Sequence, residues 1–326
     1  MDTATHFVMG VSLGGLATVN PVIANDPLLQ ASVMIATVIG SQAPDFDTVL
    51  KLRNNAVYIR NHRGITHSLP SIFIWPLLIT SGIALFTPET HWVTVFLWSF
   101  IAVFLHVFVD IFNAYGTQAL RPVSSKWIAL GVINIFDPFI FFSHIVAFGL
   151  WLVGTPPGPT FLALYMILIF YYVWRIFTKG KVVAHAKKLH PDATHVFVSP
   201  TIRWNKWHLV IRTPELLFVA SSHNNEIEYF EQYSFDPIPD IPVINAARTD
   251  SNLAAFLSFS PTYRWEIDHM EDLIEVRFID LRYRSKGHYP FVAIVRLDEK
   301  LNVLNSYTGW IFSEEKLKKK LKVATE

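Results

Sequence analysis

The sequence predicts an α-helical membrane domain of about six spans over residues 1–180, followed by a soluble, antiparallel β-rich α+β domain over residues 185–326. Hydrophobic residues make up 52% of the chain and charged residues only 16%, whereas an ordinary soluble domain has about 25% charged residues. Long apolar runs end near residue 180. After that point charges become frequent, and short segments with the alternation typical of strands begin.

Crossing a hydrocarbon core about 30 Å thick takes about 20 residues of helix, and six apolar segments approach this length. We expect spans at residues 6–23, 28–44, 69–87, 92–114, 128–153 and 159–178. The first two contain polar residues such as Asn20 and Gln30, so each either spans with a tilt or lies partly at the interface. The alternative interpretation is that these segments are buried helices of a soluble enzyme.

Lys and Arg residues indicate the orientation, because cytoplasmic loops are enriched in them. Up to residue 190 they occur only between spans two and three, between spans four and five, and from the end of span six onward. This distribution predicts a multi-pass protein of the cell (inner) membrane with both termini in the cytoplasm. It also supports the count of six, because losing one span would scatter the basic loops across both sides.

The second half has the pattern of eight short strands rich in β-branched and aromatic residues. We expect strands at residues 194–199, 207–212, 215–221, 227–234, 263–268, 273–284, 289–297 and 302–310, with a helix at 243–257. Lys286-Gly287 marks a turn, and residues 314–320 form either a short charged helix or a disordered tail. No catalytic motif stands out here, because the histidines are isolated: His208, His223, His269 and His288.

Composition narrows the chemistry. The chain has no cysteine, which excludes disulfides, thiolate metal sites and a cysteine nucleophile, so any metal ion must be held by imidazole and carboxylate groups. A net charge of +1, without a basic arm, gives no signature of nucleic-acid binding. The first apolar stretch lacks a basic region before it and carries His6, so no cleavable signal peptide is predicted.

Histidines and aspartates with metal-ligand character gather at the ends of the predicted spans. His106 and Asp110, four residues apart near the end of span four, share one face of a helix. Asp45 and Asp47 follow span two in an Asp-x-Asp motif, whose carboxylates point the same way in an extended or turn segment. The other candidates are His6, at the start of span one, and His62 and His67, in the motif His62-Arg63-Gly64-Ile65-Thr66-His67-Ser68 before span three.

The predicted topology rests on Lys and Arg alone, yet it places all seven candidates near the cytoplasmic face. Independent packing residues would have no reason to share a side, and ionisable groups at the centre of a membrane cost roughly 2.5–3.5 kcal/mol. Taken singly, each candidate also has an interpretation as a packing, capping or surface residue. We assign His91 and His144 to the interface or to packing; Asp137, before Pro138, is either a turn former or a further member of the site.

The string of Thr5-His6, Pro-Asp-x-Asp, His-Arg-Gly-x-Thr-His-Ser and His-x-x-x-Asp resembles the YfhP/YdjM-type family of bacterial membrane-bound metal-dependent hydrolases. The resemblance covers roughly residues 1–180, and the additional C-terminal domain resembles the YfhP-like subgroup of Bacillus-type organisms. It implies a metal-dependent hydrolase whose substrate is unassigned.

A looser likeness is to zinc-dependent phospholipase C and P1-type nucleases, whose helical cores hold zinc with His, Asp, His and His-x-x-x-Asp in that order. The order here fits His6, Asp47, His62 or His67, and His106 with Asp110. The later His and Glu ligands of those enzymes have no clear match after Asp110, so one or two ions are expected instead of three.

These observations predict metal-assisted hydrolysis of a phosphoester or lipid head group at the cytoplasmic membrane surface, with membrane lipids as the partners. Zn²⁺ is the expected ion and Mn²⁺ or Fe²⁺ the alternatives, because histidine with aspartate favours them over Mg²⁺ or Ca²⁺. The predicted ligands are His6, His62, His67, His106 and Asp110, with Asp45 or Asp47 bridging or acting as a base.

Arg63 either neutralises phosphate charge or anchors the loop, and Thr66 and Ser68 are expected to orient ligands. Two other function classes stay open. One is a non-enzymatic membrane regulator or scaffold with a structural metal site, whose C-terminal domain binds a protein partner. The other is a transporter. This class is disfavoured because the candidate ligands gather at one face instead of lining a path across the membrane.

Overall fold

The computed structural model describes residues 1–224, 226–285 and 287–323, and the chain divides into two compact units. Unit 1 comprises Met1–Asp47 and His62–Lys179. Unit 2 comprises Thr48–Asn61 and Gly180–Glu326. The chain therefore leaves unit 1 after Asp47, returns at His62 and leaves again after Lys179.

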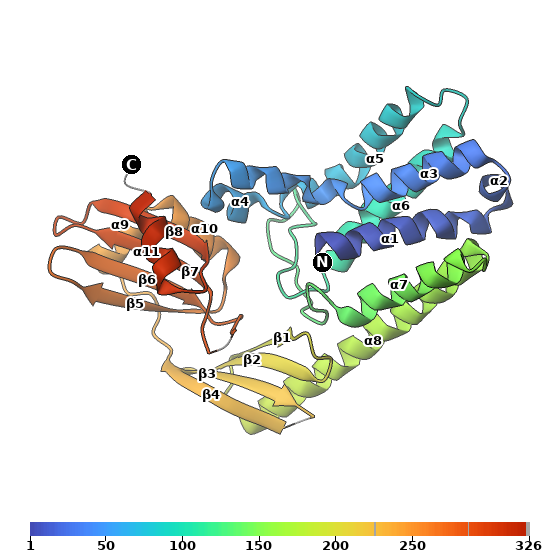
Figure 1. The fold of residues 1–326 in the computed structure, drawn as a ribbon. Helices are drawn as coiled ribbons and strands as arrows, with labels where there is room; N and C mark the ends of the chain where they lie inside the picture. The colour runs from blue at the N-terminus through green and yellow to red at the C-terminus, as the bar shows by residue number, and fades with distance from the viewer. Residues whose placement is uncertain (225, 286, 324–326) are drawn as a thin grey trace. The chain divides into compact units, whose positions relative to one another are not determined.

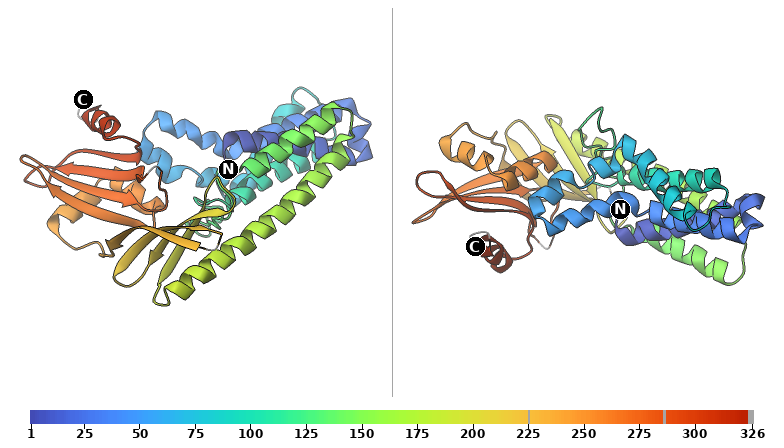
Figure 2. Two further views of the ribbon diagram at one scale, coloured as in Figure 1. Left: turned by 60° about the horizontal axis from the view of Figure 1, so that its bottom comes forward. Right: turned by 90° about the horizontal axis from the view of Figure 1, so that it is seen from above.

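Unit 1 is helical throughout its apolar segments (Figure 1). Its elements are α1 (Thr3–Leu16), η1 (Ala17–Val19), α2 (Pro21–Ala24), α3 (Pro27–Gly40), the start of η2 (Ala43–Leu52), η3 (Ile65–His67), α5 (Leu69–Ala84), α6 (Trp92–Asp110), α7 (Pro138–Leu152) and α8 (Pro157–Leu189). Helix α3 packs against α1, α5 and α6. Helices α7 and α8 lie side by side (Figure 2), with the rings of Phe148 and Phe161 5.7 Å apart.

Helix lengths bear on the predicted spans. By length and composition, two helices among the described residues, α6 and α8, can cross a membrane alone, and a third span forms if Asn55–His67 and Leu69–Ala84 count as one broken span. The apolar helices Thr3–Val19, Pro27–Gly40 and Pro138–Leu152 are shorter. At 1.5 Å per residue, the 14 residues of α3 extend about 21 Å, less than a hydrocarbon core. The count of six spans therefore stays a prediction.

The predicted start of the fifth span at residue 128 is wrong, because α7 begins only at Pro138. Proline favours the first position of a helix, and the Asp137 side chain accepts hydrogen bonds from the backbone N–H groups of Phe139 and Ile140. The other carboxylate oxygen of Asp137 accepts from the Tyr171 hydroxyl at 2.9 Å. Asp137 is thus a helix cap tied to α8, outside the cluster described below.

Unit 2 contains two antiparallel four-stranded sheets, each in sequential strand order, which confirms the predicted antiparallel β domain. The strands are β1 (His195–Pro200), β2 (Lys206–Arg212), β3 (Leu216–His223), β4 (Glu226–Ser234), β5 (Tyr263–His269), β6 (Ile274–Asp280), β7 (Phe291–Leu297) and β8 (Val303–Trp310). Its helices are α4 (Asn55–Asn61), α9 (Pro242–Arg248), α10 (Ser251–Phe259) and α11 (Glu314–Val323).

The second sheet is covered on both faces because side chains alternate along its strands. Phe278 and Ala293 belong to the core formed with α9 and α10, whereas Ile279 and Ile294 pack with Leu317 of α11. Helix α4 joins the first of these cores: Ile59 packs against it, and the Asn55 amide donates to the Thr308 carbonyl at 3.1 Å.

Two predicted boundaries in unit 2 are wrong. The single helix expected at 243–257 is two helices, because the Asp250 side chain caps a new helix by accepting from the N–H groups of Asn252 and Leu253. The strand expected at 273–284 ends at Asp280, whose buried carboxylate pairs with Arg282 at 2.7 Å and turns the chain out of the sheet. Residues 314–320 lie in helix α11. Lys286 of the predicted turn lies outside the described residues.

Candidate metal centre

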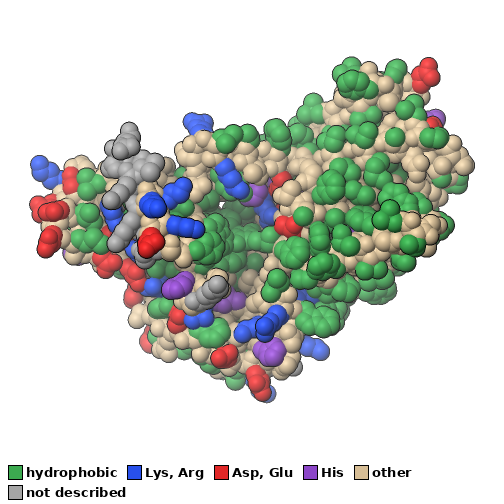
Figure 3. Space-filling model, in the orientation of Figure 1, with side chains coloured by type: hydrophobic (Ala, Val, Ile, Leu, Met, Phe, Trp, Pro, Cys, Tyr) green, Lys and Arg blue, Asp and Glu red, His purple; other side chains and the backbone are tan. Residues whose placement is uncertain are grey.

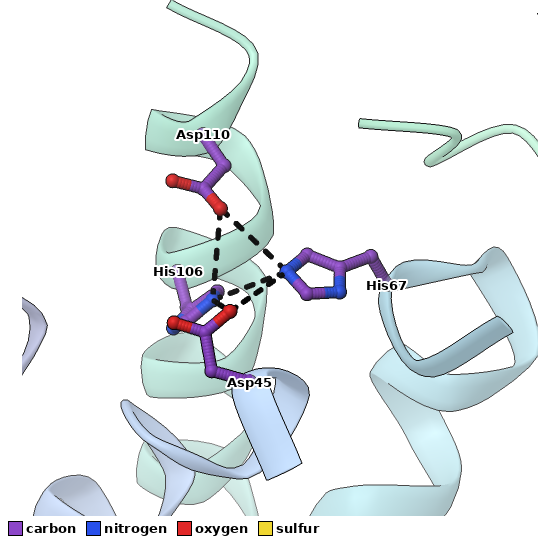
Figure 4. Close-up of side chains that lie close together, drawn as sticks. All are labelled: Asp45, His67, His106 and Asp110. Carbon is purple, nitrogen blue, oxygen red and sulfur yellow. Dashed lines mark hydrogen bonds and ion pairs between the residues drawn. The ribbon is translucent and has the colours of Figure 1, made fainter. Parts of the chain in front are cut away.

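Four side chains from three separate elements of unit 1 meet at one point (Figure 4). They are Asp45 of η2, His67 of η3, and His106 and Asp110 of α6. One ligand atom of each lies within 4.8 Å of all the others. The Nε2 atom of His67 is 3.6 Å from both Asp45 Oδ1 and Asp110 Oδ2, and 3.3 Å from His106 Nε2. Except for Asp45, these side chains have no exposed surface.

The two residues on α6 meet because of helix periodicity. Residues four apart lie one turn apart on one face, and His106 Nε2 lies 3.8 Å from Asp110 Oδ2. The same face is buried along the helix at Ser99, Ala102 and Val103. The i, i+4 spacing therefore brings an imidazole and a carboxylate together inside unit 1.

Both imidazoles are held so that Nε2 faces the cluster. The Nδ1 atom of His106 donates to the Ser41 carbonyl at 2.7 Å, because a carbonyl can only accept. Thr66 gives its single hydroxyl hydrogen to Asp47 at 2.8 Å, so its oxygen accepts from His67 Nδ1 at 3.1 Å. A neutral imidazole that donates from one nitrogen presents a lone pair on the other, as imidazole metal ligands do.

Buried oxygens in the cluster lack hydrogen-bond donors. Among the described residues, Asp45 Oδ1 and Asp110 Oδ2 are buried without a hydrogen bond. Arg63 Nη2 lies 3.2 Å from Asp110 Oδ2 as an ion pair, without the direction of a hydrogen bond. An unsatisfied buried polar group costs about 1–3 kcal/mol, and more when it is charged. A divalent cation among these atoms would satisfy them, so the donor set fits a metal ion.

The protonation states fit a cation as well. Burial, followed by the proximity of His106, lowers the pKa of His67 well below its ordinary value. An ionised carboxylate and a neutral imidazole are the forms that bind metal.

His6 extends the cluster on the α1 side. Its ring stacks on that of His106 with centroids 3.6 Å apart, and its Nε2 atom lies 3.3 Å from Asp110 Oδ1. The α-amino group of Met1 lies 2.9 Å from the same Nε2 atom and pairs with Asp110 Oδ1. Burial, followed by the proximity of Arg63, lowers the pKa of this amino group well below its ordinary value.

Asp45 and Asp47 have different partners, although the Asp-x-Asp motif predicted carboxylates that point the same way. The segment is a 3₁₀-helix, in which residues two apart point about 120° apart, instead of an extended strand or a turn. Asp45 faces the cluster, whereas Asp47 accepts from the Arg63 backbone N–H at 2.9 Å, from Thr66 and from His62 Nδ1 at 2.7 Å. One atom each of Asp45, Asp47 and His62 still lies within 4.8 Å, which makes a second group of ligand type.

Arg63 is buried within unit 1, with a φ of 59° that is uncommon for a residue with a side chain. Its Nη1 atom donates to Asn113 Oδ1 at 3.1 Å and its Nη2 atom to the Met1 carbonyl at 3.2 Å. These contacts tie the His62–His67 loop to the end of α6. Backbone strain of this kind concentrates at functional sites, where the surrounding structure holds it in place.

Three residues of the centre had not been expected: Met1, described above, Asn113 and Ser41. Asn113 donates to Asp110 Oδ1 at 3.2 Å while its own oxygen accepts from Arg63, and its place three residues after Asp110 was a signal that could have found it. Ser41 contributes a backbone carbonyl, for which sequence carries no signal. Of the two residues expected to orient ligands, Thr66 contacts His67, whereas the Ser68 hydroxyl pairs with Ser71.

The comparisons with known proteins can now be given. Residues 1–182 match the family model of the YdjM inner membrane protein, residues 191–233 the YfhP middle domain, and residues 242–321 the YfhP C-terminal alpha/beta plait domain. The chain is 53% identical over 326 residues to the Bacillus subtilis (strain 168) protein described as uncharacterized protein YfhP, covering 100% of both chains. No solved structure matches the chain. The chain therefore belongs to the YfhP/YdjM family of inner membrane proteins.

Proposed function

We propose that the chain is a membrane-bound metal-dependent hydrolase of phosphoesters or lipid head groups at the cytoplasmic membrane face. The observation that carries this proposal is the buried His/Asp cluster, in which Asp45 Oδ1 and Asp110 Oδ2 are left without a hydrogen bond. Three carboxylates, those of Asp45, Asp47 and Asp110, gather here near the single guanidinium of Arg63. A cluster with this excess of negative charge is suited to divalent cations.

Asp45, His67, His106 and Asp110 would hold the first ion, with His6 beside them. The group of Asp45, Asp47 and His62 would hold a second, with Asp45 common to both. The mixture of imidazole and carboxylate favours Zn²⁺, with Mn²⁺ or Fe²⁺ as alternatives. When bound, such an ion lowers the pKa of water and polarises phosphoryl oxygens.

Asp45, Asp47 and Arg63 would have different roles in the reaction: proton transfer, positioning and charge compensation. Asp45 is the one member of the four-residue group with exposed surface, 14% of its side chain, so it can take a proton from water. Asp47 serves mainly to position, because its oxygens already accept from Arg63, Thr66 and His62. Arg63 compensates the charge of Asp110 and secures the loop; its contact with a phosphate oxygen of substrate stays a prediction.

The membrane arrangement is also proposed: six spans with both termini cytoplasmic. All six apolar segments contain helices, and the basic residues up to 190 lie between spans two and three, between spans four and five, or in the last part of α8, which this topology places inside. The cluster lies at the ends of α3 and α6 and at the start of α5 and α1, which this topology puts on one side. Shorter helices such as α3 would require tilting or local thinning of the bilayer.

A second candidate function is a membrane regulator with a structural metal site. It is favoured by the closure of the cluster, since His67, His106 and Asp110 have no exposed side-chain surface. Structural metal sites are closed, whereas catalytic sites keep one position open. The two candidates differ in whether Asp45 borders a position that water and substrate can reach.

The test starts with the metal content of the purified intact protein. We expect stoichiometric Zn, Mn or Fe, which His67→Ala and Asp110→Ala should lose. The matched control is His144→Ala, because His144 is buried in α7 with its Nδ1 bonded to the Ile140 carbonyl, outside the cluster. A metal-free wild-type protein would overturn both candidates. Given bound metal, hydrolysis of model and lipid phosphodiesters selects the hydrolase, and its absence selects the regulator.

A further inference from the structure

We propose that the turn between β1 and β2, residues 201–205, docks on the anionic lipid surface of the membrane that α8 crosses. Ile202 and Trp204 of this turn are 63% and 60% exposed, and Arg203 between them is exposed as well. The inference goes beyond the proposed hydrolase and needs no metal ion. It depends on α8 being a span, which its length and composition allow and which fits the hydrophobic side chains that cover much of unit 1 in the view of Figure 3.

Hydrogen bonds hold the turn in one shape. The Thr201 backbone N–H donates to the Lys206 carbonyl at 3.3 Å, and the Lys206 N–H donates to the Arg203 carbonyl at 3.0 Å. The Thr201 hydroxyl oxygen also accepts from the Arg203 N–H at 3.2 Å. A turn that is already ordered loses little conformational entropy when it binds, so Ile202 and Trp204 are presented at low cost.

The residue types of the turn suit a lipid head-group layer. Tryptophan has an apolar ring and one N–H donor, and it is enriched where membranes meet water. Basic side chains such as Arg203 and Lys206 are attracted to anionic lipids. The acidic Glu226, at the same end of the sheet, lies on β4, two strands away from Lys206. The combination of apolar and basic side chains therefore fits an anionic membrane better than a neutral one.

Helix α8 attaches the first sheet close to the membrane. It is one helix from Pro157 to Leu189, and its apolar part ends at about Phe177, before Lys179. Val182 and Ala186 belong to one buried core with residues of β1, β2 and β3. The sheet is therefore fixed to α8 within about one helical turn of the end of the span.

Strand β1 runs back along α8 toward the span. The ring of His190, the residue after α8, lies 4.6 Å from the ring of Phe218, which lies in the row of the sheet that starts at Val196 of β1. The beginning of β1 is therefore beside the end of α8. At the other end of the sheet, next to the turn, Trp207 belongs to the same core as Val182, which is nearer the span. The turn thus lies at the end of the sheet that faces the membrane.

The second sheet supplies a matched control. Its turn between β5 and β6 has one exposed apolar side chain, Met270, which is 50% exposed. The next two residues, Glu271 and Asp272, are exposed and acidic instead of basic. An anionic lipid surface would repel this turn, so it should stay in water.

The experiment uses the intact protein, which has no native cysteine, in nanodiscs of phosphatidylcholine with about 30% phosphatidylglycerol. Asn205→Cys or Glu271→Cys carries an NBD label, and a lipid with a doxyl group near its head quenches NBD that reaches the bilayer. We expect quenching at position 205 and none at position 271. Equal quenching at the two positions, or none at 205, would overturn the proposal. A blue-shifted but unquenched label at 205 would also overturn it, because protein would then cover the turn.

Variants of the turn separate its two contributions, with the label kept at position 205. Ile202→Ser with Trp204→Ser should abolish quenching and leave Tm unchanged, because both side chains are exposed; Met270→Ser is the control and should quench like the parent. Arg203→Gln with Lys206→Gln should lower the ratio of docked to free turn by about 30-fold, the loss expected for two basic side chains at an anionic surface. Unchanged quenching in either double variant, or in phosphatidylcholine alone, would contradict docking on anionic lipid.

Discussion

The hydroxyl of Thr66 donates to Asp47 at 2.8 Å, and the same oxygen lies 3.1 Å from the Nδ1 atom of His67. Asp47 is not one of the four central residues, yet through Thr66 it sets the orientation of the imidazole of His67, which is. The order Asp47, Thr66, His67 fixes one tautomer of His67 and raises the basicity of its Nε2 atom.

Thr66→Val should therefore weaken metal binding without removing a ligand. Losing the partner of a metal-binding imidazole reduces affinity by about 10- to 100-fold, and we expect a loss in that range for zinc in competition with a chromogenic chelator. The control is Thr37→Val, since Thr37 is buried in α3 and bonded to the Met34 carbonyl of its own helix. Equal affinity of the two variants would show that the Thr66 contact has no influence on His67.

The two aspartates of the Asp-x-Asp motif should respond in opposite ways to replacement by asparagine. Asp47→Asn removes an acceptor shared by three donors and should lower the free energy of unfolding by about 1–3 kcal/mol. In metal-free protein, Asp45→Asn replaces a buried carboxylate oxygen that has no donor, so it should be at least as stable as the wild type.

For metal affinity the order of the two variants is reversed, because Asp45→Asn should be affected more than Asp47→Asn. Asp45→Asn should abolish metal binding, and Asp47→Asn should only weaken it. Thermal unfolding with and without chelator measures both effects. A metal-free Asp45→Asn protein that unfolds well below the metal-free wild type would contradict the interpretation of Asp45 as a ligand without a partner.

The absence of native cysteine makes the proposed topology directly measurable. Single cysteines at Glu89, Ser125 and Asp192, all exposed positions, report on the 3–4 connection, the 4–5 connection and the region after α8. In intact cells a membrane-impermeant maleimide should label Glu89→Cys alone. After the membrane is opened, all three should react. Labelling of Ser125→Cys or Asp192→Cys in intact cells would show that the orientation or the number of spans differs from the proposed arrangement.

His208 gives unit 2 a dependence on pH. Its Nε2 atom lies 2.8 Å from the Leu281 carbonyl, and burial lowers the pKa of the imidazole. The folded state therefore binds fewer protons here than the unfolded state, whose histidine pKa is about 6.5. Stability should be full above that pH and fall as the pH drops through 6.5 toward the lower pKa of the folded protein.

The measurement is the thermal unfolding of the intact protein at about pH 8 and about pH 5. His208→Gln should narrow the difference in Tm between the two conditions relative to the wild type, because glutamine does not titrate. His269→Gln, at an exposed position at the end of β5, should leave that difference unchanged. A difference that is the same in all three proteins would assign the pH dependence to other groups.

The spacing of apolar residues and the turn residues between segments allowed much of the fold to be predicted. Eight strands and six apolar helices follow from alternation and apolar runs, and the His106/Asp110 pair follows from i, i+4 spacing. The errors arise where a local hydrogen bond determines the start of a helix. Asp137 caps α7, which the apolar pattern had extended, and Asp250 caps α10, which the pattern had merged with α9. The 3₁₀ path of η2 was also missed, and with it the separation of Asp45 from Asp47.

The contributions of Ser41 and Met1 could not be predicted, because a backbone carbonyl and an amino terminus carry no residue-type signal. The same holds for the membership of α4 in unit 2. Seven residues of helix in a loop between two apolar segments give no indication that their packing partner is a β-sheet domain far along the chain.

That excursion of the chain has a consequence for biosynthesis. Asn55 of α4 bonds to Thr308, 253 residues later, so at about 5–20 residues per second the ribosome delivers the partner roughly 13–50 s after α4 itself. His6, Asp45, Asp47, His62, His67, His106 and Asp110 have all been synthesised by then, and the Asp47–His62 pair closes the loop at the point where α4 leaves unit 1. If the cluster binds an ion as proposed, it can do so while the second unit is still being translated, and α4 reaches its packing partner only later.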